Sequence, residues 1–236
     1  MLASIRDEAP DGSRRPAAPA TVNRARGTLR AAFTQARKQR LIDWDPWGAV
    51  PAEPTPDHDQ VDPDLVLDPA DIWLLADECG RIKARHRAFV LVQGLCGLRP
   101  GEAMELRRRN LTLVDGAAYV TVRGSRTSIP SRFLAEGEGR RRPLKGRGPK
   151  ATRTVPVPTR LADVLRGHLD AFVASRADAV VCTSATGGRL HPSSFRRDVW
   201  YPARAAVFDE ASPLRRVRLH DLRHSAITIW PTPACR

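Results

Sequence analysis

The sequence predicts a mainly α-helical fold with one small antiparallel β-sheet, which places it in the α+β class. Between residues 22 and 36, apolar residues recur at steps of three and four, the period of an amphipathic helix, and several further apolar helices are expected along the chain. An Asp-Gly pair between two short apolar runs at 111–122 indicates a β-hairpin. The chain has 236 residues, of which 42% are hydrophobic, so it can bury the core of one or two domains.

Charge and cysteine content narrow the classes of function. Lys and Arg number 39 and Asp and Glu 26, a net charge of +13, so we expect a polyanionic partner. The four cysteines lie far apart without a C-x-x-C pair, which argues against a disulfide framework or a zinc knuckle. No apolar run has the length of a membrane span, and the first residues lack the apolar core of a signal peptide. We therefore expect a cytoplasmic protein that does not contact membranes.

The N-terminal quarter divides into three segments. Residues 1–20, rich in Pro, Ala and charge, predict a mobile arm. Residues 21–50 predict an amphipathic basic helix with Thr21 as its N-cap, and its positive face is either simply solvated or tracks phosphates. The phosphate-binding candidates there are Arg24, Arg30, Arg37 and Lys38. Residues 51–66, rich in Pro and Asp and without Lys or Arg, predict a semi-rigid linker to a larger domain at 67–236.

The larger domain is expected to alternate helices with the small sheet. Pro69, preceded by Asp68, suits a first helical position, and Gly97 ends the next helix. A third strand follows a long basic loop. The expected helices are one beginning at 69, then 84–96, one beginning past 101, 160–175, 193–207 and 220–230, and the expected strands are 111–114, 117–122 and 153–157.

Two clusters of polar residues suit phosphate chemistry. Arg99 lies in a Gly-rich turn between helices, where its planar fork fits two phosphate oxygens and Glu102 can hold it from behind; a plain surface arginine is the alternative. On one helix face, His220, Arg223 and His224 point the same way. Their spacing resembles a zinc helix, but the intervening arginine would repel a dication, so we expect an anion and no metal or cofactor.

The third feature is a basic run at 139–160 that contains eight basic residues and no acidic ones. The run ends in a strand-like segment. It therefore predicts either a loop between strands that places a lysine in a groove, or a solvated loop. Its candidate DNA contacts are Arg140, Arg141, Arg142, Arg147 and Arg153.

Taken together, GLRPGEAMELRRRNL, PLKGRGPKATRTVPVP and LHDLRHSAITIW resemble the catalytic domain of the tyrosine recombinases, the phage-integrase family. The resemblance covers residues 21–230. The stretch from residue 21 to 50 is similar to the end of the helical core-binding domain that precedes the catalytic domain in that family, and it is shorter than the whole domain. The resemblance implies duplex DNA with attachment-type sites as the partner, other recombinase protomers on that DNA, and no cofactor.

The resemblance also implies a role for individual residues. Arg99 would grip the scissile phosphate with support from Glu102, and His220 and Arg223 would be the H-x-x-R pair. Lys145 would protonate the departing 5′-hydroxyl, with Lys150 as the alternative.

The sequence departs from the family pattern after Arg223. The family places its nucleophilic tyrosine a few helical turns beyond H-x-x-R, whereas the tyrosines here, Tyr119 and Tyr201, precede that motif. This pattern predicts a catalytic domain truncated before its nucleophile that binds DNA without cutting it. The alternatives are a recombinase that uses Tyr201 or a partner protomer's nucleophile, and a non-catalytic basic DNA-binding regulatory protein.

Overall fold

The computed structural model describes residues 16–45, 47, 61–114, 117–127, 129, 134, 141–144, 148 and 151–230. The chain forms two compact units, residues 1–60 and 61–236. Most of the predicted mobile arm and linker, and the Asp-Gly turn of the hairpin, lie outside the described residues. Within the described ranges, no helix has the length and apolarity to cross a membrane.

The first unit contains one long helix, α2 (Pro19–Lys38). It begins two residues before the predicted N-cap Thr21, because Pro19 occupies the first turn, where its missing N–H costs nothing, and Ala18 is the N-cap. After the helix, the ring of Trp47 packs edge-on against Phe33, with 6.1 Å between the ring centroids. Val22 is the buried residue of the helix.

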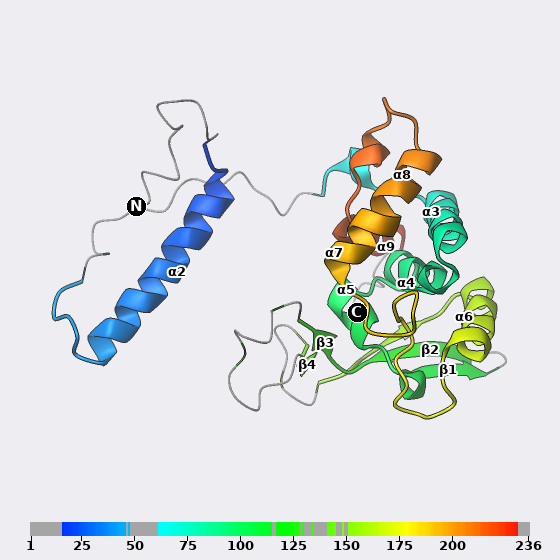
Figure 1. The fold of residues 1–236 in the computed structure, drawn as a ribbon, viewed down its shortest axis with the longest axis horizontal. Helices are drawn as coiled ribbons and strands as arrows, with labels where there is room; N and C mark the ends of the chain where they lie inside the picture. The colour runs from blue at the N-terminus through cyan, green and yellow to red at the C-terminus, as the bar shows by residue number, and fades with distance from the viewer. Residues whose placement is uncertain are drawn as a thin grey trace, which may run out of the picture. The chain divides into compact units, whose positions relative to one another are not determined.

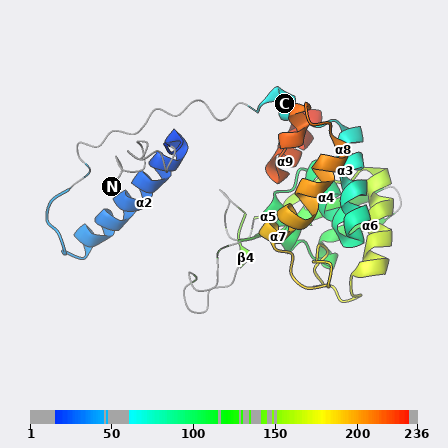
Figure 2. The same cartoon turned by 45° about the horizontal axis from the view of Figure 1, so that its top comes forward.

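The second unit is built around a helix that is buried on all sides, α4 (Arg87–Gly94), in which every residue from 88 to 94 is buried. The other helices are α3 (Pro69–Ile82), α5 (Pro100–Glu105), α6 (Thr159–Phe172), α7 (Pro192–Phe195), α8 (Tyr201–Val207) and α9 (Leu219–Ile229). Short 3-10 turns are η1 (Pro63–Leu65), η2 (Ala84–His86), η3 (Arg108–Asn110) and η6 (Pro213–Arg216). In Figure 1 and Figure 2, α9 and α3 flank α4, in agreement with their contacts.

The strands form two antiparallel sheets where one was expected. The predicted sheet has the order β1 (Leu111–Val114), β2 (Ala117–Val122) and β5 (Arg153–Pro156). Its centre is Val120, which pairs with Leu111 on one side and Val155 on the other and is fully buried. The second sheet, missed in the basic run, pairs β3 (Ser125–Arg126) with β4 (Arg141–Arg142). Its strands are two residues long, too short for an alternating pattern to reveal them.

The helix expected at 193–207 is divided by a π-helical turn, η5 (Arg196–Trp200), between α7 and α8. Pro202 has no N–H to donate to the carbonyl of Asp198, so a regular α-helical ladder cannot pass this point. The turn places Trp200 in the core, where its indole N–H donates to the carbonyl of Val217 at 3.2 Å.

Hydrogen bonds link the start of the domain to α9. The N–H of Leu67 donates to Ser225 Oγ on α9 at 2.9 Å, and that hydroxyl donates to the carbonyl of Asp221 at 2.8 Å. At the start of α3, Asp68 is the N-cap and accepts a hydrogen bond from the N–H of Asp71 at 2.8 Å, and the helix begins at Pro69 as expected. The hydrogen bond between Leu67 and Ser225 joins the first and last segments of the domain.

Two glycines in helices give opposite expectations for stability. A Cβ at Gly94 would lie 2.5 Å from Ile72 Cγ2, so Gly94→Ala should lower the free energy of unfolding by about 1–3 kcal/mol through overpacking. A Cβ at Gly167, inside α6, meets nothing within 4 Å, so Gly167→Ala should raise it by about 0.5–1 kcal/mol. Urea unfolding of both variants measures the two changes, and a stabilising Gly94→Ala would contradict this packing of α4 on α3.

Candidate active site

Arg99 is held at the surface by the carboxylate of Glu102. The two residues are the N-cap and the third position of α5, which follows a turn at Gly97 whose φ of +61° is in the left-handed region favoured by glycine. Glu102 Oε2 accepts the N–H of Arg99 at 2.9 Å, and Oε1 lies 3.2 Å from Arg99 Nη1. The Glu102 side chain is 1% exposed and that of Arg99 37% exposed, so a buried anion orients a cation that faces solvent. Glu102 therefore restricts the orientation of the Arg99 side chain.

A second guanidinium group shares this carboxylate. Arg153, the first residue of β5, has its Nη2 2.9 Å from Glu102 Oε2. The sequence predicted Arg153 as a DNA contact within a basic run and gave no sign of this ion pair. The pairing depends on β5 lying beside β2, with Arg153 opposite Val122, which brings together residues 51 positions apart.

The third guanidinium group comes from α9. Arg223 donates a hydrogen bond from Nη1 to the carbonyl of Gly97, at the turn that leads to Arg99. Leu222 and Ala226 are buried, and α9 packs against α4, which fixes the distance between this helix and the turn. We refer to Arg99, Glu102, Arg153 and Arg223 as the arginine clamp.

The clamp carries more positive than negative charge. Burial lowers the pKa of Arg223, and the positive charges of Arg99 and Arg153 lower it further, whereas Glu102 opposes the shift. Three guanidinium groups thus face one carboxylate. A doubly hydrogen-bonding anion such as a phosphate would relieve their mutual repulsion.

His220 lies beside the clamp. Its ring packs edge-on against that of His224, with centroids 4.8 Å apart. Burial lowers the pKa of His220, and the nearby charges of His224 and Arg223 lower it further. A histidine with a pKa below its ordinary value is neutral at pH 7 and can take up or pass on a proton. The structure therefore brings together four predicted residues: Arg99, Glu102, His220 and Arg223.

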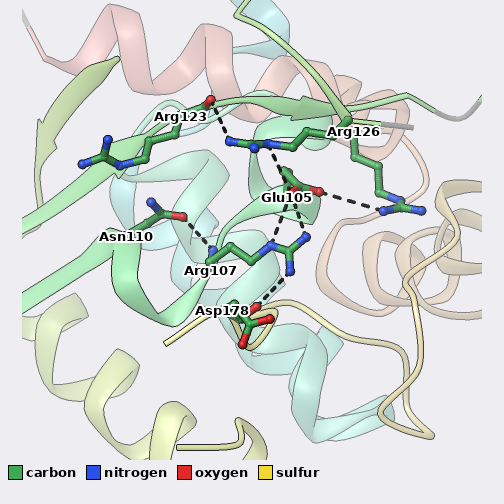
Figure 3. Close-up of polar contacts among 7 residues, drawn as sticks. Glu105, Arg107, Asn110, Arg123, Arg126 and Asp178 are labelled. Carbon is green, nitrogen blue, oxygen red and sulfur yellow. Dashed lines mark hydrogen bonds and ion pairs between the residues drawn. The ribbon is translucent and has the colours of Figure 1, made fainter. Parts of the chain in front are cut away.

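A second carboxylate, that of Glu105, contacts three arginines next to the clamp, and one of them belongs to the basic run. Glu105, at the end of α5, is 2.9 Å from Arg107 Nη2, 3.6 Å from Arg141 Nε on β4 and 3.9 Å from Arg126 Nη1 on β3 (Figure 3). Arg141 also donates to the carbonyl of Arg123 at 3.4 Å. Arg142 is on β4, and the predicted residues of this run that lie outside the described residues are Arg140, Lys145, Arg147 and Lys150.

The predicted basic residues of the first unit are all on α2 and exposed: Arg24, Arg30, Arg37 and Lys38. Of these, Arg37 forms an ion pair with Asp45 at 3.1 Å. Their role in binding DNA stays a prediction. Among the described residues, no group of three His, Cys, Asp or Glu side chains could hold a metal ion.

Comparison with known proteins agrees with the fold described above. The sequence profile of the phage integrase family matches residues 66–230. A protein of Mycobacterium tuberculosis (strain CDC 1551 / Oshkosh) named as the prophage phiRv2 integrase is 29% identical over 149 residues, which are 61% of this chain and 35% of that protein. The match thus spans about a third of the length of this curated relative.

Two solved structures share the fold. A Tn1549 transposon integrase in complex with transposon right end DNA has a TM-score of 0.62 at 16% identity, with 95% of this chain and 71% of that chain covered. A XerH site-specific recombinase bound to difH substrate has a TM-score of 0.53 at 18% identity, with 89% and 53% covered. Both resemblances show a mainly helical fold with a small antiparallel sheet.

The pKa of His220 should be measurable by NMR titration of its ring protons. We expect a midpoint below the ordinary 6.5, and an upward shift toward 6.5 in His224→Gln, because burial remains but one nearby positive charge is removed. His191→Gln, which changes a histidine outside this site, should leave the midpoint unchanged. A midpoint at or above 6.5 in the unsubstituted protein would contradict the described environment.

Proposed function

The chain belongs to the phage integrase family, and we propose that its arginine clamp binds a backbone phosphate of duplex DNA as part of a site-specific tyrosine recombinase domain. The observation that supports this most directly is the clamp itself, in which the buried carboxylate of Glu102 pairs with Arg99 and Arg153. Arg223 donates to the carbonyl of Gly97 beside them and is close enough for their charges to shift its pKa. A net charge of +13 favours association with a polyanion. We expect attachment-type sites as the DNA and other protomers of the recombinase as partners on it.

In this proposal each clamp residue has a defined task. Arg99 and Arg223 each donate two N–H groups to non-bridging phosphate oxygens, and Glu102 restricts the rotation of Arg99 so that its fork is already oriented. As negative charge grows on the non-bridging oxygens of a pentacoordinate phosphorane, fixed guanidinium groups stabilise it without reorganising. When a nucleophile from outside this chain bonds to the phosphorus and the bond to the 5′-oxygen breaks, His220 assists proton movement and Lys145, or Lys150, protonates the departing 5′-oxygen.

We further propose that neither tyrosine of this chain attacks the phosphate. Tyr201 begins α8, and the guanidinium carbon of Arg204 lies 5.0 Å from the centre of its ring. Tyr119 lies in the middle of β2, opposite Pro156. Among the described residues, no hydrogen bond joins either hydroxyl to the clamp or to His220, whereas a nucleophile needs a group within reach to activate it. The 236-residue chain would then bind DNA without cleaving it.

A non-catalytic, regulatory DNA-binding role is the second candidate function. The placement of Tyr119 and Tyr201 favours it, because a clamp without a nucleophile can still occupy a site and exclude an active enzyme. Formation of a covalent adduct would exclude this second role, whereas its absence agrees with both candidates.

Substitution of the clamp should weaken DNA binding without unfolding the domain. A hydrogen bond to a charged group contributes about 1.5–3 kcal/mol, so Arg99→Ala and Arg223→Ala should each lower affinity for a duplex by about tenfold or more. Arg99→Lys should not restore it, because an ammonium group lacks the planar fork. Fluorescence anisotropy across a salt series measures affinity, and the matched control Arg81→Ala removes an exposed arginine of α3 that pairs with Glu78.

The melting temperature of each clamp variant should also be measured. If a variant keeps its affinity for DNA but its melting temperature falls by a large amount, these arginines stabilise the fold rather than bind DNA. An affinity for DNA that does not change with salt concentration would contradict contact with phosphate.

Incubation with a nicked suicide substrate should give no 3′-phosphotyrosyl adduct on a denaturing gel. Tyr201→Phe and Tyr119→Phe should bind DNA as the unsubstituted chain does, because neither hydroxyl forms a hydrogen bond with a clamp residue among the described residues. An adduct that is formed by the unsubstituted chain and absent in either variant would identify that tyrosine as the nucleophile and overturn this part of the proposal.

A further inference from the structure

We propose that a cavity beside the clamp is a binding site for a single oxyanion of the phosphate class. The cavity has a volume of about 200 Å³ and lies between η3 and the end of β2. Its polar lining includes Arg109, Asn110 and Arg123, which have no part in the clamp. Sites for drug-sized molecules and cofactors measure about 300–1,000 Å³, so this one suits an ion or one group of a larger molecule.

Asn110 provides a buried donor whose direction is fixed. The residue is 5% exposed, and its Oδ1 accepts the N–H of Arg107 at 3.0 Å, which caps η3. This hydrogen bond determines which side of the amide is oxygen, so Nδ2 is on the other side. Nδ2 is buried and has no partner among the described residues. An unsatisfied buried donor costs about 1–3 kcal/mol, which an acceptor in the cavity would recover.

Two arginines at the rim of the cavity can contribute positive charge to the site. Arg109 and Arg123 are exposed, and within the described part of the chain neither guanidinium group has an ion pair or a hydrogen bond. Figure 3 shows Arg123 and Asn110 on the same side of Glu105 in that view. Two cations and a neutral donor at one cavity are the donor set that a tetrahedral oxyanion requires.

The carboxylates that line the cavity do not cancel this charge, because each already has cationic partners. Glu102 holds Arg99 and Arg153, and Glu105 holds Arg107 and Arg141. Asp178 has its Oδ1 3.7 Å from Arg176 Nε, and its carbonyl accepts from Arg107 Nη1 at 2.8 Å. The ligand is therefore an anion rather than a cation.

The oxyanion can come from two sources with the same chemistry. One is a DNA backbone phosphate next to the one in the clamp, a source that rests on the proposed function. The other is free phosphate, which needs no DNA. Separate measurements with each source distinguish them.

The first measurement follows the side-chain NH₂ signal of Asn110 and the Nε–H signal of Arg123 by NMR while inorganic phosphate replaces chloride at constant ionic strength. We expect saturable shifts of both signals, and an apparent Kd raised at least fivefold in Arg123→Gln. Asn110→Asp keeps an oxygen for the N–H of Arg107 but removes the donor, so the shift of Arg123 should disappear. Arg81→Gln, the matched control, should respond as the unsubstituted protein does.

The second measurement adds a duplex and determines the salt dependence of its affinity for Arg109→Gln, Arg123→Gln and Arg81→Gln. If a DNA phosphate fills the site, the Asn110 signal shifts on adding DNA, and the slope of log K against log salt falls by about 0.9 for each phosphate that the variant no longer binds, with Arg81→Gln unchanged. If free phosphate alone fills it, the slopes agree and only the first measurement responds. Each result supports the site and identifies the source of its ligand.

The proposal is overturned if the Asn110 and Arg123 signals move with neither phosphate nor DNA while the protein remains folded. This outcome is separate from failure of the proposed function, which is measured by the affinity of Arg99→Ala and Arg223→Ala. The signal shifts of Asn110 and Arg123 can be absent while the clamp variants still lose affinity for DNA, and the reverse can also occur.

Discussion

The carboxylate of Glu102, buried between Arg99 and Arg153, is the interaction on which the site depends. A buried charge is strongly unfavourable unless it is paired and hydrogen-bonded, and here both oxygens have partners. Loss of Glu102 would leave three guanidinium groups close together without compensation. The same ion pairs join helix α5 to strand β5, so one side chain both orients the cations and connects the sheet to the helices. Stability and anion binding therefore depend on one residue.

The rest of the domain determines the distance between the clamp's parts. α9 carries His220 and Arg223 and packs on α4, whose burial on all sides leaves it little freedom to shift. Ser225 accepts from the N–H of Leu67, which ties α9 to the segment that precedes α3. Arg223 and Arg99 lie 124 residues apart in the sequence, and packed helices rather than a continuous motif bring them together.

The local features of this fold could be predicted from the sequence, and the long-range pairings could not. The Asp-Gly pair predicted the hairpin of β1 and β2, and Asp68 before Pro69 predicted a helix start, because both signals act over a few residues. The motif around Arg99 also predicted Glu102 as the support of that arginine, because the two residues lie only three positions apart. Arg153 was predicted as a surface contact, because its partner is found only once β5 is paired with β2. That Nδ2 of Asn110 is buried without a partner likewise could not be predicted, because burial is set by the packing of distant segments and not by a local residue pattern.

Glu105 has a consequence for how the chain tolerates change in length. It contacts Arg126 and Arg141, which are also paired across β3 and β4, so both ends of the segment 127–140 are fastened to α5. Because the two strands are held by Glu105 and by their own pairing, their position does not depend on the length of chain that joins Arg126 to Arg141. A change in that length should therefore leave the clamp undisturbed.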